Sequence, residues 1–414
     1  MNEPLLKDES FESNEISIES NQEYDPKIIE EDEPKQNLEG ILSIFLIRFD
    51  IKKGNIIEYF YPNDFDISGV EFKALASGLH DVQNDIIMFK FKQFFGISYY
   101  FKQELKQEDE IKKERGVRMR SIGVLSPTFV SLNSHINSLK KISEKILIKN
   151  DFSDLDEYFK EKVSKIPRED WTVEKVQKIP HLRIATKHPV GSFSNFINFF
   201  QINCLLIWKA AHLRKRILFF SMPPIADVSF QVYCACFLTK LPKKNNEFSI
   251  IDPNPLFYVD LNEIDSIAML EHYIAFTTEK IFEVKERVWD LYLNLNEPKI
   301  NEKAKKVLTL SKSDEQKFAV ISEELKDIQL SLNTNPSLSY GAVSISESQL
   351  EHKLFKIFKK LNFDLIKFLN FAKNHSNISL KDLNQFQFGD DDVEFLKEIL
   401  KLYFIDSTIS SGCC

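Results

Sequence analysis

Residues 204–221, CLLIWKAAHLRKRILFFS, constrain the fold more than any other stretch of the chain. They predict the end of an apolar helix, a basic turn, and then a strand over residues 216–221. Residues 217–220 are all apolar, so this strand has no face that is suited to water. Such strands belong to parallel sheets that helices cover on both sides. We therefore expect a parallel or mixed sheet in the centre of the chain.

The segment before this strand predicts one helix over residues 193–212. Its apolar residues recur at three- and four-residue steps, which is typical of a helix with one buried face. They are Phe196, Phe199, Phe200, Leu206, Ile207 and Ala210. The predicted helix is followed by three cationic residues, Arg214, Lys215 and Arg216. Their positive charges interact favourably with the carboxyl end of the helix dipole.

The N-terminal part of the chain predicts an antiparallel sheet followed by a helix. Five segments rich in Phe, Ile and Tyr have strand character, at residues 41–50, 56–61, 85–91, 94–101 and 116–125. The first two flank Gly54, a hairpin signal in which glycine supplies a positive φ. A short helix is expected over residues 70–79. A longer one is expected from Ser126-Pro127, with Ser as N-cap and Pro as first residue. Its apolar stripe consists of Phe129, Leu132, Ile136, Leu139, Ile142 and Ile146.

The remainder of the chain alternates strands and helices and ends in helices. Residues 165–192 contain Pro167, Pro180 and Pro189 and predict a linker. A helix after Pro223-Pro224, strands at 256–260 and 273–277, and a helix over 279–295 are expected next. A Ser/Asn-rich break is predicted at 331–346. Two further helices follow, whose apolar stripes run from Leu350 to Ala372 and from Val393 to Tyr403, the second capped by residues 390–392.

Charge separates a tail from a body. Residues 1–39 hold 13 acidic and three basic residues, a net charge of −10, whereas the whole chain of 414 residues carries −8. The tail has few large apolar residues and is expected to be disordered. The body is then near +2, which gives no indication of a nucleic-acid partner. With no signal peptide or membrane helix expected, and cysteines mostly in apolar contexts, the chain is predicted to be cytoplasmic.

Several kinds of catalytic site are excluded by spacing. The closest two of the 11 glycines, Gly116 and Gly123, are too far apart for a Walker loop, a dinucleotide fingerprint or a GxSxG elbow. No two histidines are spaced for a zinc helix, and Cys234 and Cys236 are too close together for a CxxC pair. The sequence thus predicts no cofactor and no metal, and nothing in it points to a catalytic pair of carboxylates.

Three sets of residues remain as candidates. Arg118 and Arg120 are two residues apart on a predicted strand, so their side chains share one face. There they could bind a phosphate or carboxylate on a partner, or form a solvated outer face. Cys413-Cys414 resembles the double-cysteine ending that is geranylgeranylated on Rab GTPases; palmitoylation, or two exposed thiols, are the alternatives. Ser221, Met222, Pro223 and Pro224 follow the central strand, and ligands bind beyond the carboxyl ends of such strands. The alternative, which we favour for the residues themselves, is a simple turn whose prolines start the next helix.

The order of several short motifs resembles the DENN-domain proteins, and among them the LCHN-like subgroup. The matching stretches are Val70-Glu71-Phe72-Lys73 with Ala76-Ser77-Gly78, Phe94-Phe95-Gly96, Arg115-Gly116 with Arg118-Met119, residues 121–127, His188-Pro189, residues 213–218, residues 277–283 and Cys413-Cys414. The resemblance spans roughly residues 41–295. It implies an α+β and α/β architecture after the tail of residues 1–39. A longin-like (upstream DENN) module at 40–164, a linker at 165–192, a central α/β DENN module at 193–295 and a helical (downstream DENN) module at 296–410 would follow.

The resemblance also implies a function. DENN proteins are guanine-nucleotide exchange factors for small GTPases, usually of the Rab group, in membrane trafficking. Such a protein would be cytoplasmic or peripheral on vesicle or endosomal membranes. Two alternatives stay open: a GTPase-binding scaffold or trafficking adaptor without exchange activity, and a GTPase-activating protein of the folliculin type. The latter needs an arginine that reaches the nucleotide, for which Arg118 and Arg120 are the candidates.

Overall fold

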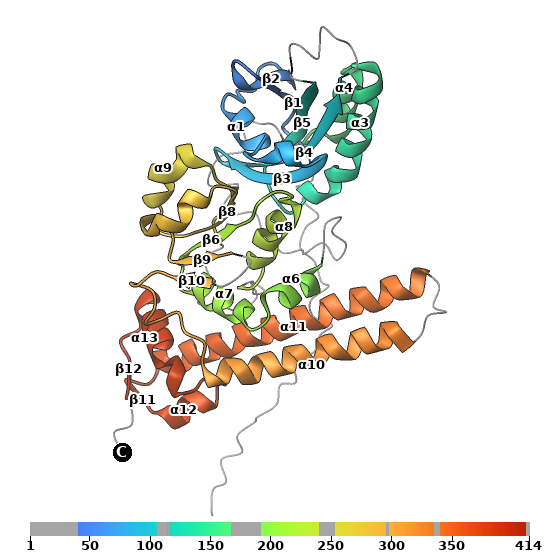
Figure 1. Cartoon of the computed structure of the whole chain (residues 1–414). Coiled ribbons are helices and arrows are strands. Elements are labelled where there is room, and N and C mark those ends of the chain that lie inside the picture. Colours follow the sequence, from blue (N-terminus) through green and yellow to red (C-terminus); the bar gives the residue numbers. More distant parts are fainter. Residues whose placement is uncertain are drawn as a thin grey trace, which may run out of the picture. The chain divides into compact units, whose positions relative to one another are not determined.

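A single mixed sheet of ten strands runs through the computed structural model, which describes residues 40–105, 114, 116–166, 192–239, 253–294, 298–334 and 340–410 (Figure 1). The strand order is β10-β9-β6-β8-β7-β3-β4-β5-β1-β2. Eleven α-helices within these described residues accompany the sheet. The fold is therefore a mixed α/β architecture.

The first five strands form the antiparallel part of the sheet, as expected. They are β1 (Ser43–Asp50), β2 (Gly54–Tyr61), β3 (Asn84–Phe91), β4 (Phe94–Glu104) and β5 (Val117–Ser126). Every neighbouring pair among them is antiparallel. The hairpin between β1 and β2 has Gly54 at φ 77°, which confirms the glycine signal.

The helices of this part differ from the prediction in their boundaries. The short helix α1 covers only Val70–Ala74, and a 3₁₀ turn, η2, follows at Leu79–Asp81. The long helix α3 (Ile136–Lys149) does not begin at Ser126-Pro127, because Ser126 is the last residue of β5. A 3₁₀ turn, η3 (Leu132–His135), precedes α3, and α4 (Ser153–Lys162) follows it. The predicted stripe is nevertheless buried from Phe129 to Ile146, since the apolar residues keep their period across the turn.

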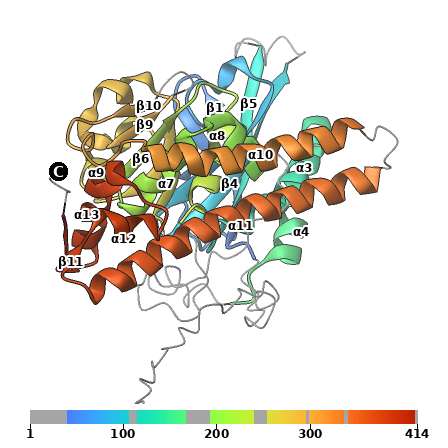
Figure 2. The same ribbon diagram turned by 90° about the horizontal axis from the view of Figure 1, so that it is seen from below.

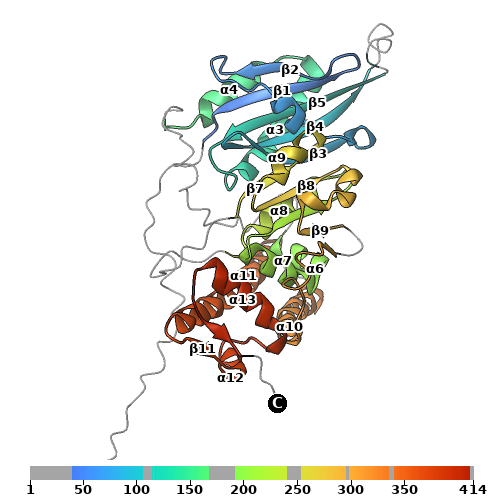
Figure 3. The same cartoon turned by 90° about the vertical axis from the view of Figure 1, so that its left-hand side faces the viewer.

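The central strands are parallel, as the apolar stretch predicted. Strands β6 (Arg216–Phe220), β7 (Pro255–Tyr258), β8 (Tyr273–Thr277) and β9 (Leu291–Leu293) run the same way (Figure 3). Both faces of β6 are covered: Ile217 and Phe219 belong to one apolar cluster and Leu218 to a second. Strand β10 (Pro298–Ile300) is antiparallel to β9 and closes this edge.

Two of the predicted central helices need correction. Residues 193–212 form two helices, α6 (Phe193–Phe200) and α7 (Asn203–His212), because Gln201 adopts φ 48° and ψ −136°. Phe199 consequently lies exposed at the surface. Residues 279–295 are not a helix but two 3₁₀ turns, η6 (Lys280–Val284) and η7 (Glu286–Val288), followed by β9. The predicted helix after Pro223-Pro224 is confirmed as α8 (Ala226–Ala235), and the short helix α9 spans Ile264–Ala268.

The antiparallel and parallel parts share one sheet because β3 pairs with β7 at Phe89 and Phe257. Aromatic packing covers this junction: the Phe257 ring lies 5.5 Å from that of Phe129 and 6.4 Å from that of Phe95. No pattern in the sequence predicts this pairing. The module limits inferred from the family resemblance stay a prediction, and the linker expected at 165–192 lies mostly outside the described residues.

The C-terminal part is helical, as predicted, but its helices are longer. Helix α10 (Lys312–Thr334) was missed, and α11 spans Tyr340–Lys373 beside it (Figure 2). The break expected at 331–346 is helical at both ends. Helices α12 (Leu380–Asn384) and α13 (Val393–Leu402) follow, the latter preceded by the 3₁₀ turn η8 (Asp390–Asp392). The short strands β11 (Asn377–Ile378) and β12 (Thr408–Ile409) pair with each other.

Buried ions join the helical part to the parallel sheet. Lys209 of α7 is fully buried, and its Nζ donates to the carboxylates of Asp314 and Asp392, the latter at 2.8 Å. The same Nζ donates to the Thr309 carbonyl at 3.0 Å. Burial alone would raise the pKa of Asp392, but Lys209 and Lys317 hold it below its usual value. Three chain segments thus converge on one ammonium group.

A second buried network surrounds Asn362 of α11. Its Oδ1 accepts hydrogen bonds from Trp208 Nε1 at 2.7 Å and, with that tautomer, from His212 Nε2 at 2.9 Å. Its Nδ2 donates to the Leu238 carbonyl at 2.8 Å. Burial lowers the pKa of His212 to about 4, since the charged form would lose its hydration.

We expect His212 to make the stability of the protein depend on pH. The pKa is below the unfolded value of 6.5, so the unfolded chain takes up the proton first. The contribution of His212 is complete above that value and is lost as the pH falls toward 4. At about pH 5 the loss should be about 2 kcal/mol. Urea unfolding at several pH values measures it; an unchanged pH slope in His212→Gln would contradict this assignment.

Candidate functional site

The carboxyl ends of the four parallel strands meet at one edge of the sheet. Because β9, β6, β8 and β7 are neighbours and run the same way, the residues that follow them lie along this edge. The segment after β6 is Ser221–Pro224 in sequence, the stretch singled out above; Thr278 follows β8, and Asn294 follows β9. Open α/β sheets bind their ligands at such edges.

The four predicted residues take different positions there. Met222 is 57% exposed, and Pro224 is exposed as well. Ser221 is half-buried, and its backbone N–H donates to the Thr277 carbonyl at 3.2 Å, which extends the pairing of β6 with β8. Pro223 packs against Gly78, whose φ is +85° and where an added Cβ would lie 3.3 Å from Pro223 Cγ. Glycine therefore fits this close approach and this backbone conformation.

A pocket of about 210 Å³ opens at this edge between α6 and α8. Its base is aromatic, and its rim is polar. The aromatic lining is Phe196, Phe199, Phe200, Phe219, Phe220 and Phe230. The other lining residues are Asn195, Ser221, Pro224, Asp227, Val228, Gln231, Leu293 and Asn294. The pocket suits an apolar side chain of a partner, with amide and carboxylate groups at the rim to accept or donate hydrogen bonds.

Asp85, at the start of β3, fixes the entry to α8. One carboxylate oxygen accepts from the Ile225 N–H at 2.7 Å, and the other accepts from the Ala226 N–H at 2.9 Å. The carboxylate therefore satisfies backbone donors at the amino end of α8, where negative charge is favoured. Burial raises the pKa of Asp85, and the three backbone hydrogen bonds that it accepts oppose that shift. The sequence offered no sign of this role, since Asp85 appeared only as the first residue of a strand.

Helix α1 and the loop after it also contact the edge. Lys73 Nζ donates to the Tyr258 carbonyl at 3.0 Å and to the Glu263 carboxylate. The Ser77 N–H donates to Tyr258 Oη at 3.2 Å. These contacts bring the end of α1 and the loop after it close to the end of β7. The edge is thus built by both the antiparallel and the parallel part of the sheet.

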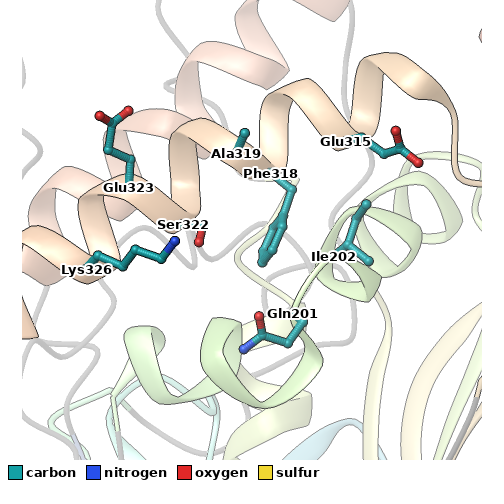
Figure 4. A pocket seen from close by; sticks show the side chains of 8 residues that line it. All are labelled: Gln201, Ile202, Glu315, Phe318, Ala319, Ser322, Glu323 and Lys326. Atoms are coloured by element: carbon teal, nitrogen blue, oxygen red, sulfur yellow. The ribbon is translucent and has the colours of Figure 1, made fainter.

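A larger hollow of about 730 Å³ lies between α10 and the break that separates α6 from α7 (Figure 4). The Phe318 ring points from α10 toward Gln201 and Ile202, while Glu315, Ser322, Glu323 and Lys326 supply polar groups. None of the residues predicted as functional lies here. We therefore place the candidate site at the strand edge.

Arg118 and Arg120 lie elsewhere, on β5, which four strands separate from β6 in the sheet. Arg120 is 2% exposed, and its guanidinium forms two hydrogen bonds of 2.8 Å with Glu58 and one of 2.8 Å with Asn150. The expectation of a solvated outer face is therefore wrong for Arg120. Arg118 is bound by both carboxylate oxygens of Glu114, at 2.7 to 3.0 Å. The structure does not bring these arginines to Ser221–Pro224 in the sheet.

The described residues include neither the predicted lipidation sites nor a cluster of metal ligands. Cys413 and Cys414 lie outside the described residues, so lipidation stays a prediction. Among the residues that are described, no three His, Cys, Asp or Glu side chains are grouped to hold a metal ion. Nor does any described helix combine the length and apolarity needed to span a bilayer.

Comparison with known proteins identifies the family. The family profile described as DENN domain-containing protein 11 matches residues 44–305. The rat protein of that name is 34% identical over 69% of this chain and 64% of its own length, and the Xenopus laevis protein is 33% identical over 70% and 68%. The zebrafish protein is 29% identical over 90% of this chain and 77% of its own. The chain thus spans slightly less than two thirds of the rat protein. The profile matches more than half of the chain, and the rat and Xenopus laevis proteins are 34% and 33% identical to it. The chain therefore belongs to the DENN domain protein family.

Proposed function

We propose that this protein is a guanine-nucleotide exchange factor that promotes GDP-to-GTP exchange on a small GTPase of the Rab type in membrane trafficking. DENN domains generally act as exchange factors for Rab GTPases, and membership of that family is the observation that carries the proposal. On the order of its motifs, we further assign the chain to the LCHN-like subgroup, with a longin-like first module and a cytoplasmic location, peripheral on vesicle or endosomal membranes.

Exchange needs binding energy rather than covalent chemistry. A factor that binds the nucleotide-free GTPase more tightly than the loaded form lowers the barrier to GDP release. The protein must therefore offer a shaped, partly apolar surface that stabilises a displaced loop of the GTPase. Such a surface requires no acid, base or metal.

The strand edge has the properties of such a surface. Three large apolar side chains on it are 46 to 57% exposed: Phe199, Met222 and Leu261. They come from α6, the segment after β6 and the 3₁₀ turn η5 (Leu261–Glu263). Exposed apolar groups around an aromatic pocket are typical of protein interaction sites.

The two alternative functions gain less support. A folliculin-type GTPase-activating protein would need an exposed arginine, and Arg118 and Arg120 are both held by carboxylates. A scaffold that binds the GTPase without accelerating exchange would use the same surface, so only an assay separates it from an exchange factor.

We expect Met222→Glu to lower the exchange rate at least about tenfold, because it places a charge in the centre of an apolar contact. The measurement is release of labelled GDP from a panel of purified Rab proteins. Met269→Glu is the matched control, since Met269 is 84% exposed, follows α9 and lies outside the segment after β6. Its exchange rate should equal that of the unaltered protein.

The same panel tests the proposal as a whole. Binding without acceleration of GDP release for every Rab would support the scaffold instead. Faster GTP hydrolysis would support the GTPase-activating protein. Equal losses in the Met222 and Met269 variants would show that the strand edge is not the contact surface.

A further inference from the structure

Helix α11 presents a row of lysines to solvent on one face. From Lys353 to Lys373 the helix contains six lysines and a single acidic residue, Asp364. Its buried face carries Leu354, Phe358, Leu361, Leu365 and Phe368. On the opposite, exposed face, Lys356, Lys360, Phe363 and Lys367 follow one another at steps of four, three and four residues. This spacing places them in one line, about 16 Å long. We call these four residues the α11 basic row.

Few carboxylates lie close enough to neutralise the positive charge of this row. Lys367 is 4.0 Å from Asp364, whose pKa burial raises, so the pair is weak. Lys353, beside the row, is 3.0 Å from Glu324. Within the part of the chain that the structure describes, no ion pair is found for Lys356 or Lys360. The row therefore keeps a positive charge that faces the solvent.

Helix α3 shows how different a balanced basic face is. It carries Lys140, Lys141, Lys145 and Lys149, but Glu144 lies among them. Lys145 is paired at 2.7 Å with Asp154 of α4, a helix that also carries Asp156, Glu157 and Glu161. Lysine content alone thus does not distinguish α11; the scarcity of neighbouring carboxylates does.

An exposed aromatic ring lies within the row. Phe363 is 44% exposed, and the Lys367 Nζ is 4.6 Å from its ring centroid. Beside the row, the Lys359 Nζ is 4.7 Å from the Phe355 ring. An aromatic ring with a lysine ammonium group beside it combines an apolar side chain with positive charge, as suits the boundary between lipid headgroups and acyl chains.

We propose that the α11 basic row docks this protein onto an anionic lipid bilayer. The negative surface of a cytoplasmic leaflet complements the row, each lysine near it adds to the attraction, and Phe363 can insert between headgroups. The contact leaves the strand edge available: Phe193 of α6 packs on Phe358 of α11, whereas Asn195 and Phe199 of α6 line the pocket. The inference does not depend on exchange activity.

The test is partitioning of the full chain onto vesicles. Binding is expected to vesicles with about 30% phosphatidylserine in phosphatidylcholine, to be weak on pure phosphatidylcholine, and to be lost at about 0.5 M salt. The variant K356E/K360E/K367E should bind at least about 100-fold more weakly. Phe363→Ala should bind several-fold more weakly with the same salt dependence, because it removes no charge.

The control variant K140E/K141E/K149E changes the net charge by the same amount on α3 and should lose less than about tenfold. Unfolding in urea verifies that both triple variants fold. Equal losses in the two triple variants, equal binding to neutral vesicles, or binding of the row to soluble heparin but not to vesicles would each overturn the proposal.

Discussion

Replacing Lys209 by Met should lower the free energy of unfolding by about 3–5 kcal/mol, the loss typical of a buried pair that is broken on one side. The substitution leaves the carboxylates of Asp314 and Asp392, both fully buried, without their shared cation. A thioether fills the volume but donates no hydrogen bond to them. The measurement is urea unfolding of the full chain, followed by circular dichroism.

Lys306→Met provides the matched control. Lys306 pairs with Glu394 at 2.8 Å, but its side chain is 74% exposed, so its loss should leave the free energy of unfolding nearly unchanged. The variant K209M/K317M/D314N/D392N removes the stranded carboxylates together with the buried Lys317 ammonium that pairs with them, and should recover part of the loss. A change below about 1 kcal/mol for Lys209→Met would show that the ions are hydrated rather than buried.

Asp85→Ala should cost about 2–3 kcal/mol, because it leaves buried N–H groups at the start of α8 without acceptors. This substitution also bears on the site, since α8 follows the segment of Met222 and lines the pocket. We therefore expect slower nucleotide exchange in this variant than in a variant of equal stability altered elsewhere. Unfolding in urea and GDP release, measured on the same preparations, check both effects.

Asp85→Asn separates the hydrogen bonds from the charge. The amide oxygen can still accept one N–H, so about half of the loss should return. Asp66→Ala is the surface control, since that carboxylate is exposed and pairs with Lys92. If Asp85→Ala were no more destabilising than Asp66→Ala, the capping role would be wrong.

Much of the local structure could be predicted from the sequence. The five strands of the antiparallel part and the parallel strand β6 follow from local runs of apolar and aromatic residues, the helices α11 and α13 from the period of their apolar residues, and α8 from Pro223-Pro224. Such runs and periods involve neighbours a few residues apart, so a single sequence contains them. Helix boundaries were less accurate: the backbone of Gln201 divides one predicted helix into two, and Ser126 continues a strand.

The candidate site was predicted only in outline. The rule for strand ends pointed to Ser221, Met222, Pro223 and Pro224, and the structure places them beside an aromatic pocket. The pocket residues of α6 went unrecognised because Phe199 fits a buried stripe in a straight helix. Arg120 looked accessible by alternation along β5, but Glu58 and Asn150 enclose it. Alternation gives the face of a side chain and not what covers that face.

The order of residues is enough to predict the apolar strand after residue 215, its parallel character, and the motifs of a DENN domain. The folded chain alone shows that β3 pairs with β7, that Asp85 caps a helix 140 residues away, and that Lys209 binds residues 105 and 183 positions distant. This is because burial and pairing depend on which segments meet. Each isolated segment is compatible with many such meetings, and the shared core selects one.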